Sequence, residues 1–572
     1  MARYDLALFH APSVFDFRQK TMFKGPVSEV VPSLYVFDMY PYGFLTLASW
    51  LSKKGMRVGI FNLAAKMVLD PNYDPLHTIK RVEASVYGVD LHWLVHAHGA
   101  LEVARLLKDS HPESRVILGG ISASYYWREI LERYSFVDAV VLGDTTEESM
   151  EELVRRAESG RGFGGIPGVA WRDSGRIRLE PPREPPEDLD PYAVDHSVLV
   201  KMALRERDLG LIAPCASFIQ APIAAVLTVK GCQHNCVTCG GSREAFKRIF
   251  GRERVALKSP EAIAEEASSI SSMSRMTIFI LGDLRMGRGE EGSLEVLRAL
   301  KKADLDNPLM FEFFYPASRR LLEAIRALGD DVYIQISPES QDEDIRRAFG
   351  RMYGNAELEK MVRLAGELEF KRLDLYFMTG LPKQTYGTAI RVADYFSRLV
   401  EIHGTAEGID AFTAPLAPFL DPGSLAFEKP EAYGYKLLFR DLESHRRALE
   451  EPHWGLTLNY RTIWMDRPEI VEASLAASLR LAEAKRDMGL IGDDIFEAIR
   501  ERISFDRQVY ARLRSGPLTP EEEAELKEKA MELALEKELI INKELYPSAP
   551  LSECLRLPQP LGTLVAKLLG AS

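Results

Sequence analysis

Short apolar runs alternate with amphipathic stretches through the first part of the chain. The runs lie at residues 6–9, 58–63, 86–90, 115–120 and 137–143, and residues 44–54 between the first two runs have helical spacing. Strands that alternate with helices pair in parallel, with the helices covering the sheet. Residues 1–150 are therefore predicted to form an α/β domain of the Rossmann-like (flavodoxin-like) type.

The next segment, residues 151–215, has the pattern of a connector. Residues 168–179 alternate around the turn-forming residues 173–175, which predicts a β-hairpin. Residues 180–187 contain two Pro-Pro pairs. Proline removes a backbone donor and disfavours helix at the residue before it, so this stretch is expected to run extended.

A second series of strands and helices occupies residues 216–430. Apolar runs recur at 224–229, 276–281, 309–315, 332–336, 373–378 and 409–415, with helical patterns between them. Six such units predict a partial parallel barrel, short of the eight of a closed barrel. Residues 431–572 are predicted to be mostly helical, with an amphipathic helix at 470–488 and another that begins after Thr519 and runs to about residue 545.

Composition narrows the class of protein. The chain has 572 residues, 46% of them apolar, and a net charge of −12, which argues against binding to nucleic acid through bulk charge. No apolar run approaches the roughly 20 residues of a membrane span, and the first residues turn polar too early for a signal peptide. We therefore expect a cytoplasmic enzyme or module without a transmembrane segment.

Three of the five cysteines stand close together, at Cys232, Cys236 and Cys239. This Cys-x3-Cys-x2-Cys loop directly follows the first strand of the second α/β region. Three thiolates can hold three corners of a cubane iron–sulfur cluster and leave one iron open for another ligand. The alternatives are a structural zinc site, with Cys215 or His234 as the fourth ligand, and a purely structural iron–sulfur module.

The spacing and its place after a strand resemble the radical S-adenosylmethionine (SAM) superfamily. The resemblance implies that Cys232, Cys236 and Cys239 hold a 4Fe-4S cluster whose fourth iron binds SAM. One electron would then cleave SAM to a 5'-deoxyadenosyl radical that takes hydrogen from the substrate. It also implies SAM-binding residues at later strand ends, which are Gly282, Asp283, Glu339, Ser340, Arg351 and Gly380. The chain departs from the pattern at Thr238, where the superfamily usually has an aromatic residue.

An α/β domain ahead of such a core resembles the cobalamin-dependent branch of this superfamily. The loop 118–124 resembles the Gly-Gly loop that receives the nucleotide tail of cobalamin. In the Asp-x-His-x-x-Gly motif of cobalamin-binding proteins, the histidine ligates cobalt. Residues 90–95 have Val in place of the glycine and follow the third strand rather than the first. The resemblance therefore implies cobalamin without a lower histidine ligand. The implied cobalamin-binding residues at the strand ends are Pro12, Ser13, Asp90, Leu91, His92, Gly119, Gly120, Ser122, Ser124, Gly143 and Asp144.

Together these features predict an enzyme that uses a 4Fe-4S cluster, SAM and cobalamin to methylate an unactivated carbon of a small molecule or lipid. The runner-up is radical carbon–carbon bond formation or ring closure, favoured if Trp454, Tyr460 and Trp464 line an apolar groove rather than pack in a core. Radical SAM chemistry also implies an electron donor such as ferredoxin or flavodoxin.

Overall fold

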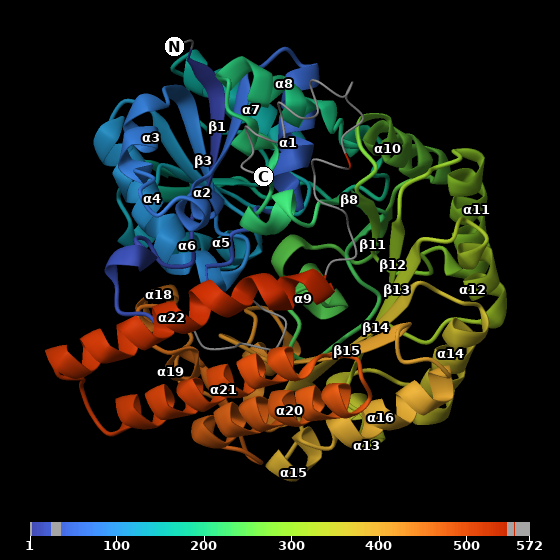
Figure 1. The fold of residues 1–572 in the computed structure, drawn as a ribbon. Helices are drawn as coiled ribbons and strands as arrows, with labels where there is room; N and C mark the ends of the chain where they lie inside the picture. Colours follow the sequence, from blue (N-terminus) through green and yellow to red (C-terminus); the bar gives the residue numbers. More distant parts are fainter. Residues whose placement is uncertain (1–2, 24–35, 546–553, 555–572) are drawn as a thin grey trace.

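The computed structural model describes residues 3–23, 36–545 and 554. Its first sheet has seven strands in the order β2-β1-β3-β4-β5-β6-β7 (Figure 1). The strands are β1 (Tyr4–His10), β2 (Val58–Asn62), β3 (Ala84–Asp90), β4 (Arg115–Gly119), β5 (Ala139–Val141), β6 (Val169–Asp173) and β7 (Arg176–Leu179). β1 to β5 pair in parallel, which confirms the predicted doubly wound sheet.

Helices cover both faces of this sheet because alternate strand residues are apolar on each side. In β1, Leu6 and Leu8 pack into one core, whereas Tyr4 and Phe9 pack into the other. The first core is covered by α1 (Tyr42–Lys53), α7 (Glu147–Glu158) and α8 (Ser197–Glu206). The second is covered by α2 (Leu63–Leu69), α3 (Pro75–Arg81), α4 (Ala97–Ser110) and α6 (Trp127–Arg133), with the short α5 (Ile121–Tyr125) after β4.

The hairpin that the sequence assigned to a connector is part of the first sheet. β6 pairs antiparallel with β5, with Val169 opposite Val141, and β7 pairs with β6. Its inner residues, Val169 and Ala170, are fully buried, so the pairing continues the core of the first domain. The Pro-rich residues 180–187 form neither helix nor strand, as predicted.

The second sheet has six parallel strands in chain order, which confirms the predicted partial barrel. They are β8 (Ile223–Leu227), β11 (Thr277–Leu281), β12 (Leu309–Phe313), β13 (Val332–Glu339), β14 (Arg372–Thr379) and β15 (Ile409–Pro415). The long helices on its outer face are α10 (Pro260–Met273), α11 (Gly289–Lys302), α12 (Arg319–Arg326), α14 (Asn355–Glu367) and α16 (Val392–His403) (Figure 1). Between these units lie β9 (Val229–Lys230), β10 (Ala256–Leu257), α9 (Arg243–Phe250), α13 (Glu343–Phe349) and α15 (Tyr386–Ala389).

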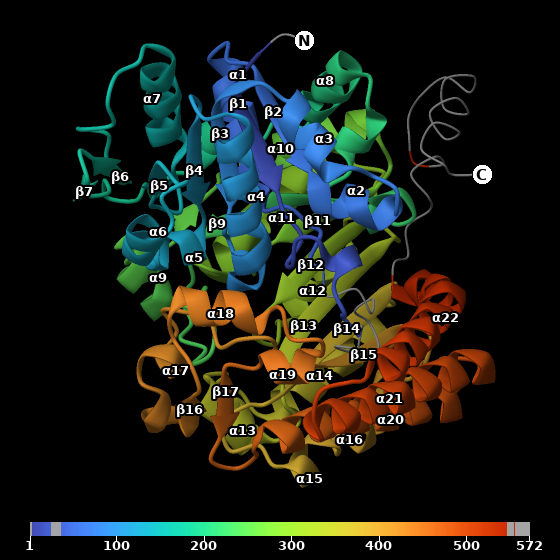
Figure 2. The same cartoon turned by 90° about the vertical axis from the view of Figure 1, so that its left-hand side faces the viewer.

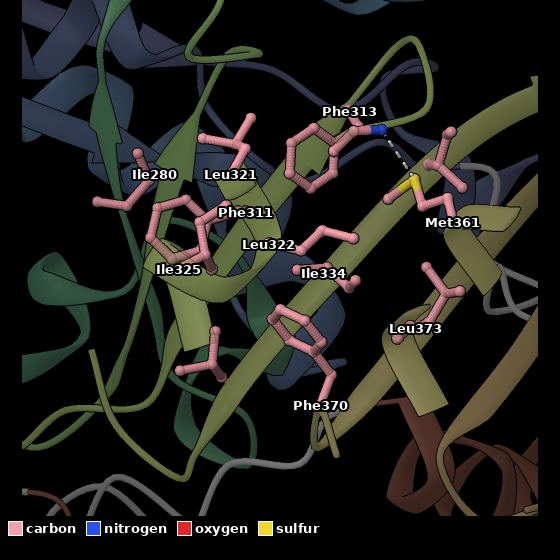
Figure 3. Packing of buried hydrophobic residues seen from close by; sticks show 14 of the residues in the cluster. Ile280, Phe311, Phe313, Leu321, Leu322, Ile325, Ile334, Met361, Phe370 and Leu373 are labelled. Carbon is pink, nitrogen blue, oxygen red and sulfur yellow. Dashed lines mark hydrogen bonds between the residues drawn. The ribbon is translucent and has the colours of Figure 1, made fainter. Parts of the chain in front are cut away.

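The core of the second domain lies between the sheet and these helices. Phe311 and Phe313 of β12 point toward Leu321, Leu322 and Ile325 of α12 (Figure 3). Because side chains alternate along a strand, residues such as Glu312 lie on the opposite face, the interior of the partial barrel. The apolar outer face thus fixes which side chains face the interior.

The C-terminal region is mostly helical, as predicted, but it also contains a two-stranded antiparallel sheet. Its elements are α17 (Leu425–Glu428), β16 (Tyr435–Leu437), α18 (Leu442–Ala448), α19 (Trp454–Thr457), β17 (Tyr460–Thr462), α20 (Arg467–Asp487), α21 (Asp493–Arg514) and α22 (Pro520–Leu545). α20 packs against β15 and α16 and closes that edge of the second sheet (Figure 2). Trp454 and Tyr460 are buried in the core of this region, so they pack rather than line a groove.

The two α/β domains are joined by buried polar contacts. Asp144, after β5, forms an ion pair with Arg252, which follows α9. Glu266 of α10 accepts a hydrogen bond from the Tyr42 hydroxyl of α1 (2.6 Å) and pairs with Lys258. Within the described part of the chain, no helix is both long and apolar enough to cross a membrane.

Candidate active site

The three cysteines lie on one loop between β9 and α9. Its backbone is held by Val237, whose N–H donates to the Phe349 carbonyl (2.8 Å), and by Arg243, whose N–H donates to the His234 carbonyl (2.9 Å). Ser242 ends the loop by capping α9 through the Ala245 N–H (3.3 Å). The loop is therefore fixed at both ends by the elements that flank it.

The thiols of Cys232, Cys236 and Cys239 are close enough to influence one another electrostatically. Burial raises the pKa of all three thiols, that of Cys236 to about 11, and each neighbouring cysteine adds to the rise at Cys239. Backbone N–H groups of His234 and Gly241 donate to the sulfurs of Cys232 (3.4 Å) and Cys239 (3.3 Å). A cluster fits this set, because iron holds thiolates in the charged form that burial alone disfavours.

A zinc site lacks its fourth ligand. Cys215 packs with Ala213 and Phe218 in a separate apolar cluster, and the His234 ring stacks on Tyr315 (4.7 Å between centroids). Among the described residues, no three or more His, Cys, Asp or Glu side chains converge on a single ion position. Cluster cysteines need not converge in this way, because each binds a different iron.

Most of the predicted SAM-binding residues surround the cysteine loop. Glu339, at the end of β13, pairs with Arg351 (3.1 Å), and both side chains are buried. The charges of both residues influence Cys236, while Asp283 and Arg351 influence Cys232. The guanidinium of Arg351 also lies over the Phe314 ring, 4.9 Å from its centroid. The strand ends of β11 and β13 thus lie near Cys232 and Cys236.

Three further predicted residues shape the backbone at these strand ends. Gly282 has φ of +100°, and a Cβ there would lie 2.5 Å from Val229. Gly380 has φ of +97°, and its carbonyl accepts a hydrogen bond from the Tyr435 hydroxyl (2.8 Å). Ser340 is buried and accepts the Asp342 N–H (3.1 Å) at the start of α13. Gly282 and Gly380 meet conformational demands that other residues satisfy poorly.

The predicted cobalamin-binding loops lie at the carboxyl edge of the first sheet, where ligands of such sheets bind. The loops after β3 and β4 pack together, because Ser122 N–H donates to the His92 carbonyl (3.0 Å) and Ala123 N–H to the Leu91 carbonyl (3.0 Å). Gly120 has φ of +112°, and a Cβ there would lie 2.6 Å from the Cα of His92. A Cβ at Gly119 would meet nothing closer than 3.9 Å, so this position has room beside it.

The other predicted cobalamin-binding residues make contacts within the protein. Ser124 Oγ accepts the Gly143 N–H (3.5 Å), and Asp144 faces Arg252 of the second domain. The Pro12 carbonyl lies against Gly99 of α4, and the Ser13 carbonyl accepts the Gly99 N–H (3.1 Å). The carboxylate of Asp144 is therefore already paired with a cation of the second domain, whereas the loops after β3 and β4 lie at the carboxyl edge of the first sheet.

A buried imidazole–carboxylate pair also lies at this edge, and the sequence pattern did not predict it. His10 Nδ1 lies 2.9 Å from Asp90 Oδ1, and the His96 ring lies 4.8 Å from that of His10. Burial disfavours a charged imidazole, but Asp90 outweighs this effect and raises the pKa of His10. Burial lowers the pKa of His92 to about 4 and of His96 to about 3, so both rings are neutral near pH 7. His10 directly follows the first predicted strand. Because ligands of parallel sheets bind at the carboxyl ends of the strands, the reasoning that selected Asp90 could also have selected His10.

Comparisons with known proteins match a family model to each of the two α/β domains. Residues 30–154 match the family model of the B12 binding domain, and residues 226–396 match that of the radical SAM superfamily. The first span covers β2 to β5, and the second runs from the end of β8 through β14.

Three curated relatives share parts of the sequence. An uncharacterised methyltransferase of Pyrococcus horikoshii is 27% identical over 228 residues, 40% of this chain and 45% of that protein. An anaerobic magnesium-protoporphyrin IX monomethyl ester cyclase of Rubrivivax gelatinosus is 24% identical over 35% of this chain and 34% of its own. A 2-(S-pantetheinyl)-carbapenam-3-carboxylate methyltransferase of Streptantibioticus cattleyicolor is 24% identical over 50% of this chain and 41% of its own. The chain thus matches less than half the length of each relative.

Two solved structures share the fold. The radical SAM methyltransferase TsrM from Kitasatospora setae, with cobalamin and a 4Fe-4S cluster bound, has a TM-score of 0.55 at 14% identity, covering 89% of this chain and all of that one. The cobalamin-dependent radical SAM enzyme OxsB, with aqua-cobalamin bound, also has a TM-score of 0.55, at 12% identity over 96% of this chain and 82% of its own. At these identities the likeness shows the fold. With the cysteine loop in place and both family models matched in order, this chain carries a B12-binding domain ahead of a radical SAM domain.

Proposed function

We propose that this protein is a cobalamin-dependent radical SAM enzyme that methylates an unactivated carbon of a small molecule. The observation that carries the proposal is the junction between the domains: the segment that bears the cysteine loop contacts the carboxyl edge of the first sheet. Lys230, just before the loop, donates to the Asp144 carbonyl (2.7 Å), and Arg252, just after α9, pairs with the Asp144 carboxylate. The B12-binding edge and the three thiols are thus held on neighbouring segments.

When bound, the cluster and SAM supply the radical that removes hydrogen from carbon, and cobalamin supplies the methyl group. The protein residues position these groups. Cys232, Cys236 and Cys239 would hold the cluster, while Arg351 and Glu339 fix the mouth of the barrel beside it. Gly119 offers space at the B12-binding edge.

The stoichiometry of the reaction distinguishes methylation from the alternative, which is ring closure or carbon–carbon bond formation. Each methylation would consume two molecules of SAM and two electrons from a low-potential donor such as ferredoxin or flavodoxin. The substrate C–H becomes C–CH3, and the products are 5'-deoxyadenosine, methionine and S-adenosylhomocysteine. Ring closure or carbon–carbon bond formation, favoured by the similarity to the cyclase of Rubrivivax gelatinosus, needs no S-adenosylhomocysteine.

We expect anaerobically reconstituted protein with cobalamin, reductant and its substrate to release 5'-deoxyadenosine and S-adenosylhomocysteine in equal amounts. Comparison of small molecules in a deletion strain and its parent supplies the substrate, which should differ from the product by one CH2. A product that lacks two hydrogens, with 5'-deoxyadenosine alone, would favour ring closure instead.

Two neighbouring glycines give a second test. Gly119→Leu should abolish cobalamin binding and leave the fold intact, because the new side chain enters open space at the B12-binding edge. Gly120→Ala should destabilise the first domain, because its φ of +112° and the nearby His92 backbone exclude a Cβ. Corrin absorbance after gel filtration measures the first effect, and thermal unfolding the second. Full corrin retention in Gly119→Leu would place the cofactor elsewhere.

A further inference from the structure

The strand next to the Asp283 loop carries a carboxylate that forms no salt bridge with any residue that the structure describes. Glu312 of β12 lies opposite Gln335 of β13 in register, on the barrel-interior face of the sheet. Its side chain is partly accessible. The Gly282 N–H donates to its Oε1 (2.5 Å), which directs the carboxylate toward the β11 strand end. Glu312 thus lies one strand away from the predicted SAM-binding loop.

Four other carboxylates on or beside this face are each matched by a cation of the protein, whereas Asp421, beside Cys239, accepts only the Gly240 N–H (2.9 Å) within the described part of the chain. Asp283 pairs with Arg285 and Glu339 with Arg351. Deeper in the sheet, Arg372 Nε lies 2.7 Å from Asp374 and Lys485 Nζ lies 2.8 Å from Asp410. Among the described residues, Glu312 forms no salt bridge of this kind. It differs from these four carboxylates in having no cation of the described chain in direct contact.

Asp283 is the residue that the resemblance implies to contact SAM. Its carboxylate oxygens, however, already accept hydrogen bonds from other protein groups. Its Oδ1 accepts from Arg285 Nε (2.9 Å) and from the Arg285 backbone N–H (3.1 Å). Its Oδ2 accepts from Arg285 Nη2 (2.6 Å) and from the Phe314 N–H (3.1 Å). A carboxylate has about four lone-pair sites, so these donors fill it. Arg285 is held in turn by the carbonyls of Tyr315 and Pro316.

The pKa of Glu312 also depends on charged groups that lie near the cysteine loop. The pKa of Glu312 is raised to about 7, mainly by burial and also by Asp283, while the Gly282 N–H, Gln335 and Arg351 oppose the rise. Asp283 and Arg351 are the same residues whose charges influence Cys232. The carboxylate therefore lies near two charged groups that also lie near Cys232, and a cation bound there would relieve the cost of burying its charge.

We propose that Glu312, and not Asp283, accepts the ammonium group of SAM in this protein. The inference rests on the proposed function, since it requires SAM at the cysteine loop. An ammonium of the amino-acid part of SAM carries three donors and one positive charge, which match an anchored carboxylate without a cation. Asp283 would then be a positioning residue that holds Arg285 and the Phe314 backbone.

The test measures SAM binding to the reconstituted protein under anaerobic conditions without reductant, so that SAM is not consumed. We expect Glu312→Gln to weaken binding at least about 10-fold, since a charge-assisted hydrogen bond is lost. Gln can still accept the Gly282 N–H, so the fold and the iron content should match those of the parent protein. Asp283→Asn, the matched control, should weaken SAM binding less than Glu312→Gln does.

A second ligand separates contact from a general disturbance of the site. An analogue of SAM without its amino group should bind to the parent protein and to Glu312→Gln with the same affinity, within about 2-fold. Equal weakening of both ligands, or full SAM affinity in Glu312→Gln, would overturn the assignment of Glu312. If the parent protein itself binds no SAM, the proposed function fails instead.

Discussion

Cys236→Ala protein should release no 5'-deoxyadenosine above background when supplied with SAM and reductant. Cys236 is 6% exposed and packs with Val237, Phe349 and Leu381, so alanine keeps most of the packing while it removes one thiolate of three. Two thiolates on a loop hold a cubane cluster poorly, since three cysteines already leave one iron open. Iron analysis should show a fall from about four irons per chain, and chromatography with mass detection measures the nucleoside.

Cys215→Ala is the matched control, because Cys215 is similarly buried (7%) but lies in a separate apolar cluster. It should retain the iron and the nucleoside release of the parent protein. Full iron content in Cys236→Ala, or iron loss in Cys215→Ala, would contradict the three-cysteine cluster. Both readouts are needed, because iron content reports the cluster and nucleoside release reports the chemistry.

Asp144→Ala should destabilise the protein by about 3–5 kcal/mol, because it strands the Arg252 charge in the interior. The Arg252 side chain is 2% exposed and that of Asp144 is 5% exposed. Arg252 Nη2 donates to Asp144 Oδ1 (3.0 Å), and Nη1 donates to the Pro186 carbonyl (2.8 Å). Urea unfolding followed by tryptophan fluorescence measures the change, and the transition of the first domain should shift together with that of the second.

Two controls isolate the buried charge. Glu187→Ala breaks the exposed pair with Arg254 (3.5 Å) nearby and should cost no more than about 1 kcal/mol. The double variant Asp144→Leu, Arg252→Met removes both charges and should recover most of the lost stability, because apolar residues of similar size replace buried pairs at little cost. A double variant as unstable as Asp144→Ala would show that the hydrogen bonds, not the stranded charge, carry the effect.

Local patterns were enough to predict most of the architecture. Alternating apolar runs identified all five parallel strands of the first sheet and all six of the second, because buried strands carry apolar residues on both faces in the first sheet and on the outer face in the second. The hairpin of β6 and β7 was recognised but its partner was not. Pairing of Val169 with Val141 is a contact between distant segments, and its strand pattern fits a separate connector equally well.

The residues of the candidate site also fall into two groups: those that the sequence marks and those that only the fold identifies. The spacing of Cys232, Cys236 and Cys239, and the glycines at strand ends, are local signals that follow from chemistry and backbone conformation. Nothing near Glu312 in the sequence marks it, since a lone Glu in an apolar strand is as compatible with solvent as with the barrel interior. His10 and Arg252 have the same ambiguity, because their importance depends on Asp90 and Asp144, which are far away along the chain.

Sequence alone established the order of the two α/β domains, the cysteine loop and the class of cofactors that such a loop implies. Folding established which charges are satisfied: Asp144 receives an arginine from the second domain, and Glu312 forms no salt bridge among the residues that the structure describes. The physical reason is that the free energy of a buried charge depends on its neighbours in space. Those neighbours are set by packing between elements that no local pattern specifies.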